Sequence, residues 1–292
     1  EAWHLITEAS RLAFADRAVW MGDEDFVPVP KAGLLNPDYV ATRSVMINPT
    51  ARMATPAAGN PLPYDTAATG DKKTQFAPHH GEDENRPSHT THFSVVDKWG
   101  NVVSYTTTIE STWGTGITVP GYGFLLNNEL TDFNFDPTRN PATGNPGAND
   151  VAANKRPRSS MAPALVFKGR EPVAAYGSPG GSTIINSVLN VTLNLIDHKM
   201  TLQDAINAPR VSITSAGNPP PATATRIARD NGIAPAVPLS PATVAGLTAL
   251  GYSIDAPVDI GSVQAVLIDP RTGRQYGAAD ARREGTVIGL PR

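Results

Sequence analysis

The stretch from Thr90 to Glu110 constrains the fold most, because its residue pattern predicts a β-hairpin in one register. Apolar and polar residues alternate from Thr91 to Val96 and again from Val102 to Glu110. Lys98, Trp99 and Gly100 fit a three-residue loop whose glycine takes the left-handed conformation. The register pairs Phe93 with Tyr105, Ser94 with Ser104, and Thr90 with Thr108. Two hydroxyl groups are therefore expected to face each other at the open end of the hairpin.

The composition indicates a globular protein and excludes several functional classes. The 292 residues are 40% hydrophobic and 17% charged, which is enough apolar material for a sizeable core. The 24 Lys and Arg residues nearly balance the 27 Asp and Glu residues, so no nucleic-acid partner is expected. No apolar run approaches the roughly 18 to 20 residues of a membrane span. Cysteine is absent, which excludes disulfides, thiolate metal sites and a cysteine nucleophile.

The N-terminal half of the chain mixes one clear helical pattern with long polar connections. Residues 1–17 show a helical stripe without an initiator Met, and we interpret the chain as a fragment whose N-terminal part is missing. Few large hydrophobic residues occur from Pro49 to His89, which is typical of a flexible tail or linker. Pro137 to Arg158 is rich in Pro, Gly and Asn and is expected to be a long loop, with a role as a lid over a site.

The remaining elements alternate between strands and helices, which favours an α+β architecture. Two strand pairs are expected, one formed by 164–168 with 172–177 and one by 263–268 with 274–279. A helix capped by Ser182 follows the Gly-rich turn, and capping patterns predict further helices at 201–209 and 240–251. Gly217 to Pro238 is Pro- and Ala-rich and is expected to be an exposed excursion.

Six runs of residues are informative together: Thr90 to Asp97, Thr106 to Glu110, Gly114 to Gly116, Leu126 to Glu129 with Asp132 and Phe133, Lys155 to Met161, and Gly177 to Gly181. These runs resemble the small subunit of the gamma-glutamyltransferases, also called gamma-glutamyltranspeptidases or glutathione hydrolases. Their order, spacing and identity all agree with that family. Further similarity extends through Ala205 to Arg210 and Gly277 to Asp280, and upstream through Ala13 to Arg17 and Gly22 to Asp23.

This resemblance implies an N-terminal-nucleophile hydrolase with an αββα sandwich, here partial because the N-terminal portion of the large subunit is missing. Residues 1–89 then correspond to the C-terminal end of the large subunit, and residues 90–292 to the small catalytic subunit. The family implies a precursor that cleaves itself between His89 and Thr90. It also implies the remainder of the large subunit as partner, and a periplasmic or secreted location.

The resemblance assigns the chemistry to four residues. Thr90 corresponds to the nucleophile, Thr108 to the residue that orients it, and Gly180 and Gly181 to the oxyanion hole. A threonine that becomes N-terminal carries an α-amino group with a pKa near ~8 beside its own hydroxyl, so one residue supplies nucleophile and general base. Backbone N–H groups at a Gly-rich turn before a helix are free to bind a developing oxyanion.

Five further residues match the family positions that bind the glutamyl end of the substrate. Glu110, Glu129 and Asp132 correspond to residues that hold the ammonium group, and Ser159 and Ser160 to donors for the α-carboxylate. Strand alternation independently predicts that the Glu110 side chain lies on the same face as Thr108. Two positions depart from the family pattern: Glu110 stands where some members have Asn, and Arg158 replaces a hydrophobic residue. The arginine that grips the carboxylate in the family lies outside this chain.

The function expected from these residues is hydrolysis and transfer of gamma-glutamyl groups from glutathione to water or to an amino-acid or peptide acceptor. Two alternatives remain, a cephalosporin (glutaryl) acylase with the same chemistry and a non-catalytic homologue. The histidines at 79, 80, 89 and 92 lack organised acidic or cysteine partners, so neither a metal ion nor a cofactor is predicted. Lys155 and Arg156 are expected to form structural charge contacts.

Overall fold

The computed structural model describes residues 1–66, 88–134, 146–214, 226–230, 232 and 234–290. Its helices are α1 (Ala2–Trp20), α2 (Lys31–Leu34), α3 (Pro37–Ser44), α4 (Ile184–Ile196), α5 (Leu202–Asn207) and α6 (Pro241–Ala249), with short 3-10 helices η1 (Leu62–Tyr64), η2 (Glu129–Asp132) and η3 (Gly181–Thr183). Its strands are β1 (Ser88–Val96), β2 (Val102–Ser111), β3 (Ala164–Lys168), β4 (Glu171–Gly177), β5 (Val211–Ser212), β6 (Arg226–Arg229), β7 (Ser253–Ile254), β8 (Gln264–Ile268) and β9 (Gln275–Ala279).

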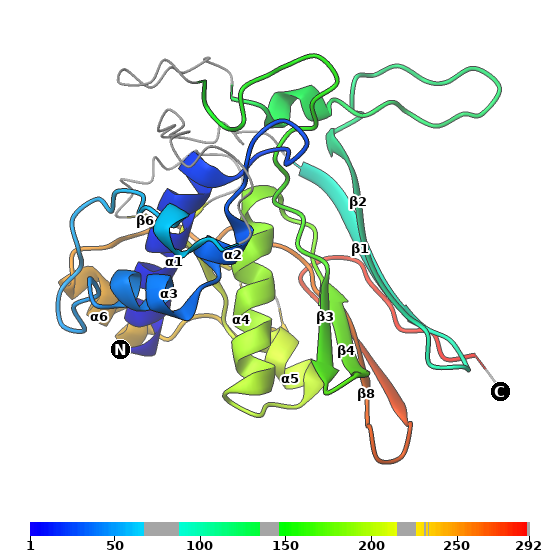
Figure 1. Cartoon of the computed structure of the whole chain (residues 1–292). Coiled ribbons are helices and arrows are strands. Elements are labelled where there is room, and N and C mark those ends of the chain that lie inside the picture. The colour runs from blue at the N-terminus through cyan, green and yellow to red at the C-terminus, as the bar shows by residue number, and fades with distance from the viewer. Residues whose placement is uncertain (67–87, 135–145, 215–225, 231, 233, 291–292) are drawn as a thin grey trace.

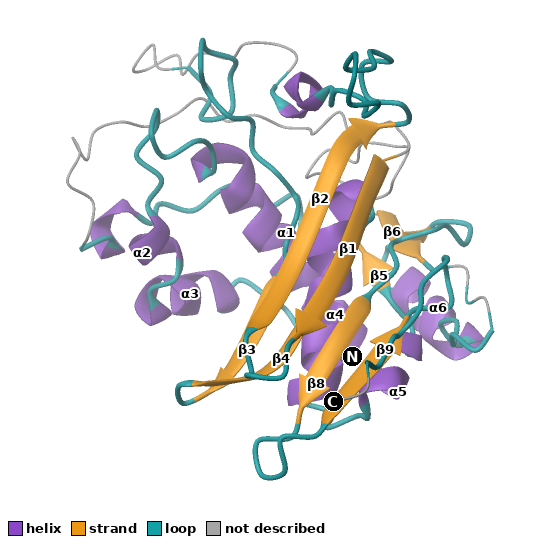
Figure 2. Cartoon of the chain, turned by 90° about the vertical axis from the view of Figure 1, so that its right-hand side faces the viewer, coloured by secondary structure: helices purple, strands orange, loops and turns teal. Residues whose placement is uncertain are grey.

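Two sheets stack on each other, and helices cover the outer face of one of them (Figures 1 and 2). The larger sheet has the strand order β3-β4-β8-β9 and is antiparallel throughout. The β1–β2 hairpin contacts β4 and β8 on one face of this sheet, and α4 and α5 contact it from the other. Polar side chains join the sheets, because Ser104 Oγ donates to the Tyr176 carbonyl at 3.1 Å and Ser94 Oγ to the Gln264 carbonyl at 3.4 Å.

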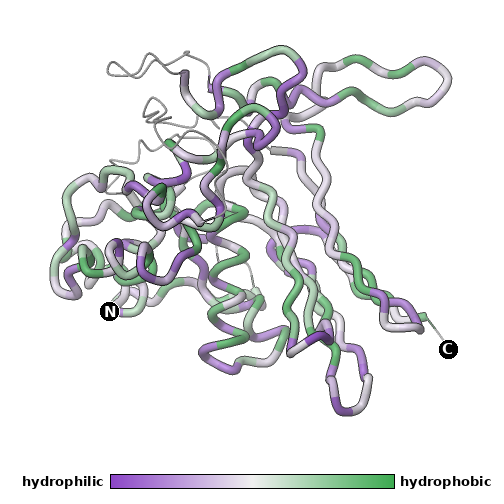
Figure 3. The backbone as a smooth tube through the Cα atoms, in the orientation of Figure 1, coloured by the Kyte–Doolittle hydropathy of each residue, from purple (hydrophilic) through white to green (hydrophobic). Residues whose placement is uncertain are grey.

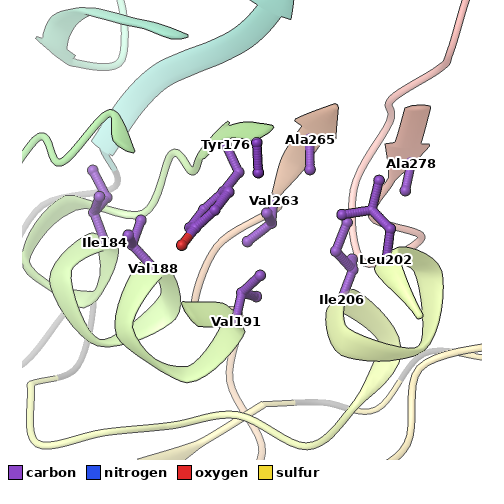
Figure 4. Packing of buried hydrophobic residues seen from close by; sticks show 10 residues of the cluster. Tyr176, Ile184, Val188, Val191, Leu202, Ile206, Val263, Ala265 and Ala278 are labelled. Atoms are coloured by element: carbon purple, nitrogen blue, oxygen red, sulfur yellow. The ribbon is translucent and has the colours of Figure 1, made fainter. Parts of the chain in front are cut away.

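The main apolar core lies between the larger sheet and the two helices (Figure 4). Side chains from α4 and α5 meet side chains from β4, β8 and β9, and the largest of these, Tyr176, is 1% exposed. The cluster comprises Ala174, Tyr176, Ile184, Val188, Val191, Leu202, Ile206, Val263, Ala265 and Ala278. Figure 3 shows the same division along the chain, with hydrophobic strands in this sheet and hydrophilic turns at their ends. The core therefore fixes the sheet on which the β1–β2 hairpin rests.

Most expected elements of the second half are confirmed. The hairpin register from Thr90 to Val96 is the predicted one, and both predicted strand pairs form β3–β4 and β8–β9. Thr201 caps α5 by accepting a hydrogen bond from the Asp204 N–H, and Ser240 caps α6 by accepting one from the Thr243 N–H. These caps satisfy N–H groups that have no partner within the helix.

Two local predictions are wrong. Ser182 does not cap α4, because the 3-10 turn η3 intervenes and Thr183 occupies the cap position without a side-chain cap bond. The predicted exposed excursion from Gly217 to Pro238 contains the strand β6, in which Ile227 is fully buried. Strand β6 pairs with β5 and β7 in a three-stranded sheet that the sequence pattern did not indicate. Residues 215–225, 231 and 233 of that excursion lie outside the described residues.

Candidate active site

The hydroxyl groups of Thr90 and Thr108 meet at the open end of the hairpin. They are cross-strand partners in β1 and β2, and Thr90 Oγ1 donates to Thr108 Oγ1 at 3.1 Å. Thr108 Oγ1 also lies 3.4 Å from the backbone carbonyl oxygen of His89, the residue that precedes Thr90. Hairpin pairing therefore brings together two hydroxyl groups and the carbonyl group of the peptide bond between His89 and Thr90.

The imidazole of His92, two residues after Thr90 in β1, packs against Gly177 of β4 between the two sheets. His92 is 4% exposed, and its Nδ1 and Nε2 atoms lie 2.8 Å from Thr106 Oγ1 and 3.1 Å from Ser94 Oγ. A Cβ atom added to Gly177 would stand 2.5 Å from the ring, so β4 approaches this closely only because Gly177 has no side chain. Burial lowers the pKa of His92 to about 4, which keeps the ring neutral at neutral pH. The sequence reasoning considered His92 only as a metal ligand and missed this packing role.

The three acidic residues Glu110, Glu129 and Asp132 influence one another electrostatically. Burial raises the pKa of Glu129, the hydrogen bond with Asp132 opposes that shift, and the negative charge of Glu110 adds to it. Within the described part of the chain, no hydrogen-bond partner reaches the buried Oε1 atom of Glu129. The prediction that strand alternation positions the Glu110 side chain is not supported, because regular alternation ends at Thr108 and Glu110 has a φ angle of 70°. The cluster therefore gathers three carboxyl groups where η2 contacts β2.

The serine pair is connected to the first helix. Ser160 is buried and accepts a hydrogen bond from the Arg17 guanidinium at 3.0 Å, whereas Ser159 is exposed and accepts one from the Met161 N–H at 3.1 Å. Arg158 stands where the family has a hydrophobic residue, so the sequence did not indicate how its side chain packs. In the structure Arg158 is 8% exposed. Its guanidinium donates to the Arg17 carbonyl at 3.2 Å, and its backbone N–H donates to Asn149 Oδ1 at 2.7 Å.

The expected structural roles of Lys155 and Arg156 are confirmed. Arg156 forms a salt bridge with Asp23 at 2.6 Å, and its contacts hold the pKa of the Asp23 carboxyl well below the usual range. Lys155 Nζ donates to the carbonyl oxygens of Ala148 and Asp150. The Arg156 contacts join the end of the loop preceding Ser159 to the first 25 residues of the chain, whereas the Lys155 contacts lie within that loop. Residues 137–145 of the predicted lid lie outside the described residues, so its role as a lid stays a prediction.

Gly180 and Gly181 form the sharp connection between β4 and α4. Their φ angles are 140° and 57°, a region that L-residues with a side chain rarely adopt. A Cβ atom on Gly180 would stand 2.7 Å from Thr183 Oγ1. The turn η3, which begins at Gly181, contacts β1. The N–H groups at the start of this helical segment therefore lie beside the strand that carries Thr90.

The similarity to known proteins covers the whole described chain. The family model described as gamma-glutamyltranspeptidase matches residues 1–290. The chain belongs to the gamma-glutamyltranspeptidase family. Its architecture is accordingly that of the N-terminal-nucleophile hydrolases.

Individual relatives support the same family membership. A glutathione hydrolase proenzyme of Bacillus subtilis strain 168 is 42% identical over 291 residues, which cover 99% of this chain and 45% of the relative. The acylase ACY 1 proenzyme of Pseudomonas sp. strain SE83 is 33% identical over 293 residues, covering 99% of this chain and 44% of the relative. The structure of gamma-glutamyltranspeptidase from Pseudomonas nitroreducens complexed with L-DON is 33% identical, with a TM-score of 0.58 over 69% of this chain and 100% of that one. The chain thus spans about half the length of the curated relatives it matches.

Two observations bear on metals and membranes. Within the described residues, no three His, Cys, Asp or Glu side chains are grouped closely enough to hold a metal ion, and His79 and His80 lie outside that part of the chain. None of the helices described for this gamma-glutamyltranspeptidase family member has the length and apolar composition needed to cross a bilayer.

Proposed function

We propose that the full-length protein is a gamma-glutamyl hydrolase and transferase that acts on glutathione and other gamma-glutamyl amides through an ester of Thr90. The observation that carries this proposal is the 3.1 Å hydrogen bond between Thr90 Oγ1 and Thr108 Oγ1 in a chain of the gamma-glutamyltranspeptidase family. A hydroxyl is a weak nucleophile unless a neighbouring group accepts its proton. Thr108 is the neighbour that orients the Thr90 hydroxyl.

In the proposed activation step, the chain cleaves itself between His89 and Thr90. Thr90 Oγ1 attacks the His89 carbonyl carbon, the C–N bond to Thr90 breaks, and the hydroxyl proton ends on the released nitrogen. Water then hydrolyses the resulting ester, which leaves a carboxylate on His89, the hydroxyl of Thr90 and a free α-amino group. The 3.4 Å separation between Thr108 Oγ1 and the His89 carbonyl oxygen supports this step, because a hydrogen bond there polarises the bond under attack.

In the proposed turnover, the α-amino group of Thr90 is the general base. An α-amino group has a pKa near ~8 and is partly neutral at physiological pH. It takes the hydroxyl proton as Oγ1 attacks the gamma-carbonyl carbon of the substrate, and it returns the proton to the leaving amine. The N–H groups of Gly180 and Gly181 stabilise the oxyanion. Water then releases glutamate, or an amino acid or peptide takes the gamma-glutamyl group.

We assign the substrate ammonium to Glu110, Glu129 and Asp132, and the α-carboxylate to Ser159 and Ser160. The buried Oε1 atom of Glu129 has no hydrogen-bond partner among the described residues, and this supports the first assignment, because an ammonium group would satisfy it. The link from Ser160 to Arg17 supports the second, because it brings a positive charge to the serine pair. This assignment favours gamma-glutamyl over glutaryl substrates, since glutaryl groups carry no ammonium.

The assignment of the ammonium site predicts a pH dependence of substrate binding. Glu129 binds the ammonium only when ionised, so KM for gamma-glutamyl-p-nitroanilide is expected to rise as pH falls through the raised pKa of this residue. Glu129→Gln is expected to raise KM at neutral pH by about ten- to a hundredfold and to flatten this acidic limb. Steady-state kinetics from pH 4.5 to 8 measure both. The exposed Glu171→Gln variant should behave as the parent, and an unchanged KM in Glu129→Gln would contradict the assignment.

A direct comparison of two substrates tests the proposed activity against its main alternative. We expect the full-length protein to hydrolyse gamma-glutamyl-p-nitroanilide with a higher kcat/KM than glutaryl-7-aminocephalosporanic acid. The acylase relative gives the alternative its support, since it is matched over nearly the same region. A preference for the glutaryl substrate would overturn the substrate assignment while leaving the nucleophile in place. Failure to hydrolyse either amide would favour the non-catalytic homologue.

The proposal also covers how the chain divides into two subunits and in which compartment the enzyme acts. Residues 1–89 form the end of the large subunit, residues 90–292 form the small subunit, and the remainder of the large subunit is the partner. We propose a periplasmic or secreted enzyme, which cell fractionation tests. Mass spectrometry of the full-length product tests the division, because cleavage at the proposed bond gives a small subunit whose first residue is Thr90.

A further inference from the structure

A β-bulge lies directly opposite the proposed cleavage site. Ser88 pairs with Ser111 and Thr90 pairs with Thr108, so β2 carries one residue more than β1 between these two pairs. The extra residue comes from the pair Ile109 and Glu110, here called the bulge, and Glu110 adopts the left-handed φ angle of 70°. Glutamate rarely adopts this conformation, since its Cβ crowds the backbone. Contacts around the bulge must therefore hold it.

The bulge turns the backbone N–H of Glu110 onto the hydroxyl of Thr108, at 2.8 Å. A threonine hydroxyl has one proton and two lone pairs. The Glu110 N–H occupies one lone pair, and the Thr90 hydroxyl donates to the other at 3.1 Å. The proton of Thr108 is then left for the His89 carbonyl oxygen at 3.4 Å. The bulge thus sets the direction of both hydrogen bonds that serve self-cleavage.

Asn128 connects to the backbone on both sides of Glu110. Its backbone N–H donates to the Ile109 carbonyl at 3.2 Å, and its Oδ1 atom accepts from the Ser111 N–H at 2.9 Å. Its Nδ2 group donates to Ser111 Oγ at 3.0 Å, and Ser111 Oγ in turn donates to the Glu110 carboxylate. A single asparagine therefore bonds to the two residues that flank Glu110.

We propose that Asn128 is a positioning residue for self-cleavage. Asn128 holds the bulge in the conformation in which the Glu110 N–H donates to Thr108 Oγ1. With one lone pair of that oxygen occupied, the Thr108 hydroxyl donates its proton to the His89 carbonyl and accepts the hydrogen bond from Thr90. This inference rests on the proposed function. It gives the Glu110 backbone a role in self-cleavage, separate from the role of the Glu110 side chain in binding the substrate ammonium. Sequence reasoning missed Asn128 because two of its three hydrogen bonds to β2 go to backbone groups, which leave no residue signature.

The test compares self-cleavage rates in the full-length protein. Asn128→Ala is expected to slow cleavage at least about tenfold, whereas Asn101→Ala, at the far turn of the same hairpin, should cleave at the parental rate. Glycine adopts positive φ angles without strain, so Asn128→Ala combined with Glu110→Gly should recover most of the lost rate. Asn128→Ala combined with Glu110→Val should recover none, because a β-branched residue strongly disfavours that region. A merely structural role for Asn128 would not show this selective rescue. Parental cleavage in Asn128→Ala, or equal rates in the two double variants, would overturn the proposal.

Hydrogen exchange provides a second measurement that does not depend on cleavage. In the Thr90→Ala background, Asn128→Ala and Thr108→Val are each expected to accelerate exchange of the Glu110 amide at least about tenfold, because each removes support for the bond to Thr108. Unchanged exchange in Asn128→Ala would overturn the positioning role. If the parent protein never cleaves, the proposed function fails, and this exchange experiment still decides whether Asn128 holds the bulge.

Discussion

The Thr90→Ala variant of the full-length protein is expected to remain a single uncut chain and to lose amide hydrolysis. Under the proposed mechanism, the variant lacks the single oxygen, Thr90 Oγ1, that attacks the His89 carbonyl in the precursor and forms the ester with the substrate in the mature enzyme. Loss of a nucleophile of this kind lowers kcat by about a thousandfold or more. Mass spectrometry measures the first effect, and release of p-nitroaniline from gamma-glutamyl-p-nitroanilide measures the second.

Two further variants make this experiment specific. Thr90→Ser keeps the hydroxyl but loses the β-branch that restricts its rotamers, so it should cleave and turn over substrate at a reduced rate. Thr91→Ala changes a neighbouring threonine whose side chain is exposed in β1, and it should behave as the parent. Cleavage and full activity in Thr90→Ala would overturn the proposed function as a whole.

The hairpin was predictable because the information that determines it is local. Alternation from Thr91 to Val96 and from Val102 to Thr108, with Gly100 in the loop, leaves one register that keeps each side chain on its own face. The observed pairs follow it, and Gly100 has the expected positive φ angle of 86°. The bulge at Glu110 was not predictable in the same way. Glutamate gives no signal for a left-handed conformation, and the contacts that hold it come from Asn128, across a long loop.

The three-stranded sheet shows the same limit on a larger scale. Strands β5 and β7 have two residues each, too short to show alternation, and β6 follows a Pro- and Ala-rich stretch. Their pairing depends on residues far apart in the chain, such as Val211 with Arg229 and Ile227 with Ile254. Among the site residues, the pairing of Thr90 with Thr108 followed from the pattern. The assignment of Gly180 and Gly181 depended on the family resemblance, because a Gly-Gly turn alone also fits an ordinary tight connection.

Two runs that carried the family resemblance without any assigned chemistry meet in a buried ionic network. Arg210, from the run 205–210, forms a salt bridge with Asp280, from the run 277–280, and both side chains are fully buried. Arg282 bridges Asp280 at 3.1 Å and Asp230 at 3.1 Å. Asp280 also accepts from the backbone N–H of Val263 at 2.9 Å, next to strand β8. The network joins the end of the four-stranded sheet to the segment that follows α5.

Asp280→Ala is therefore expected to cause the largest loss of stability among substitutions remote from the threonine pair. Removing this carboxylate leaves two buried guanidinium groups with one aspartate between them, and breaking a buried pair in this way costs about 3–5 kcal/mol of unfolding free energy. Urea unfolding in the Thr90→Ala background measures the loss on an uncut chain. Glu24→Ala, which removes the exposed pair with Lys31, should cost less than about 1 kcal/mol. A loss in Asp280→Ala as small as that of Glu24→Ala would mean that the network adds nothing to stability. Asp280→Asn, which keeps an oxygen for the Val263 N–H, should fall between the two, because it loses the charge but not the backbone contact.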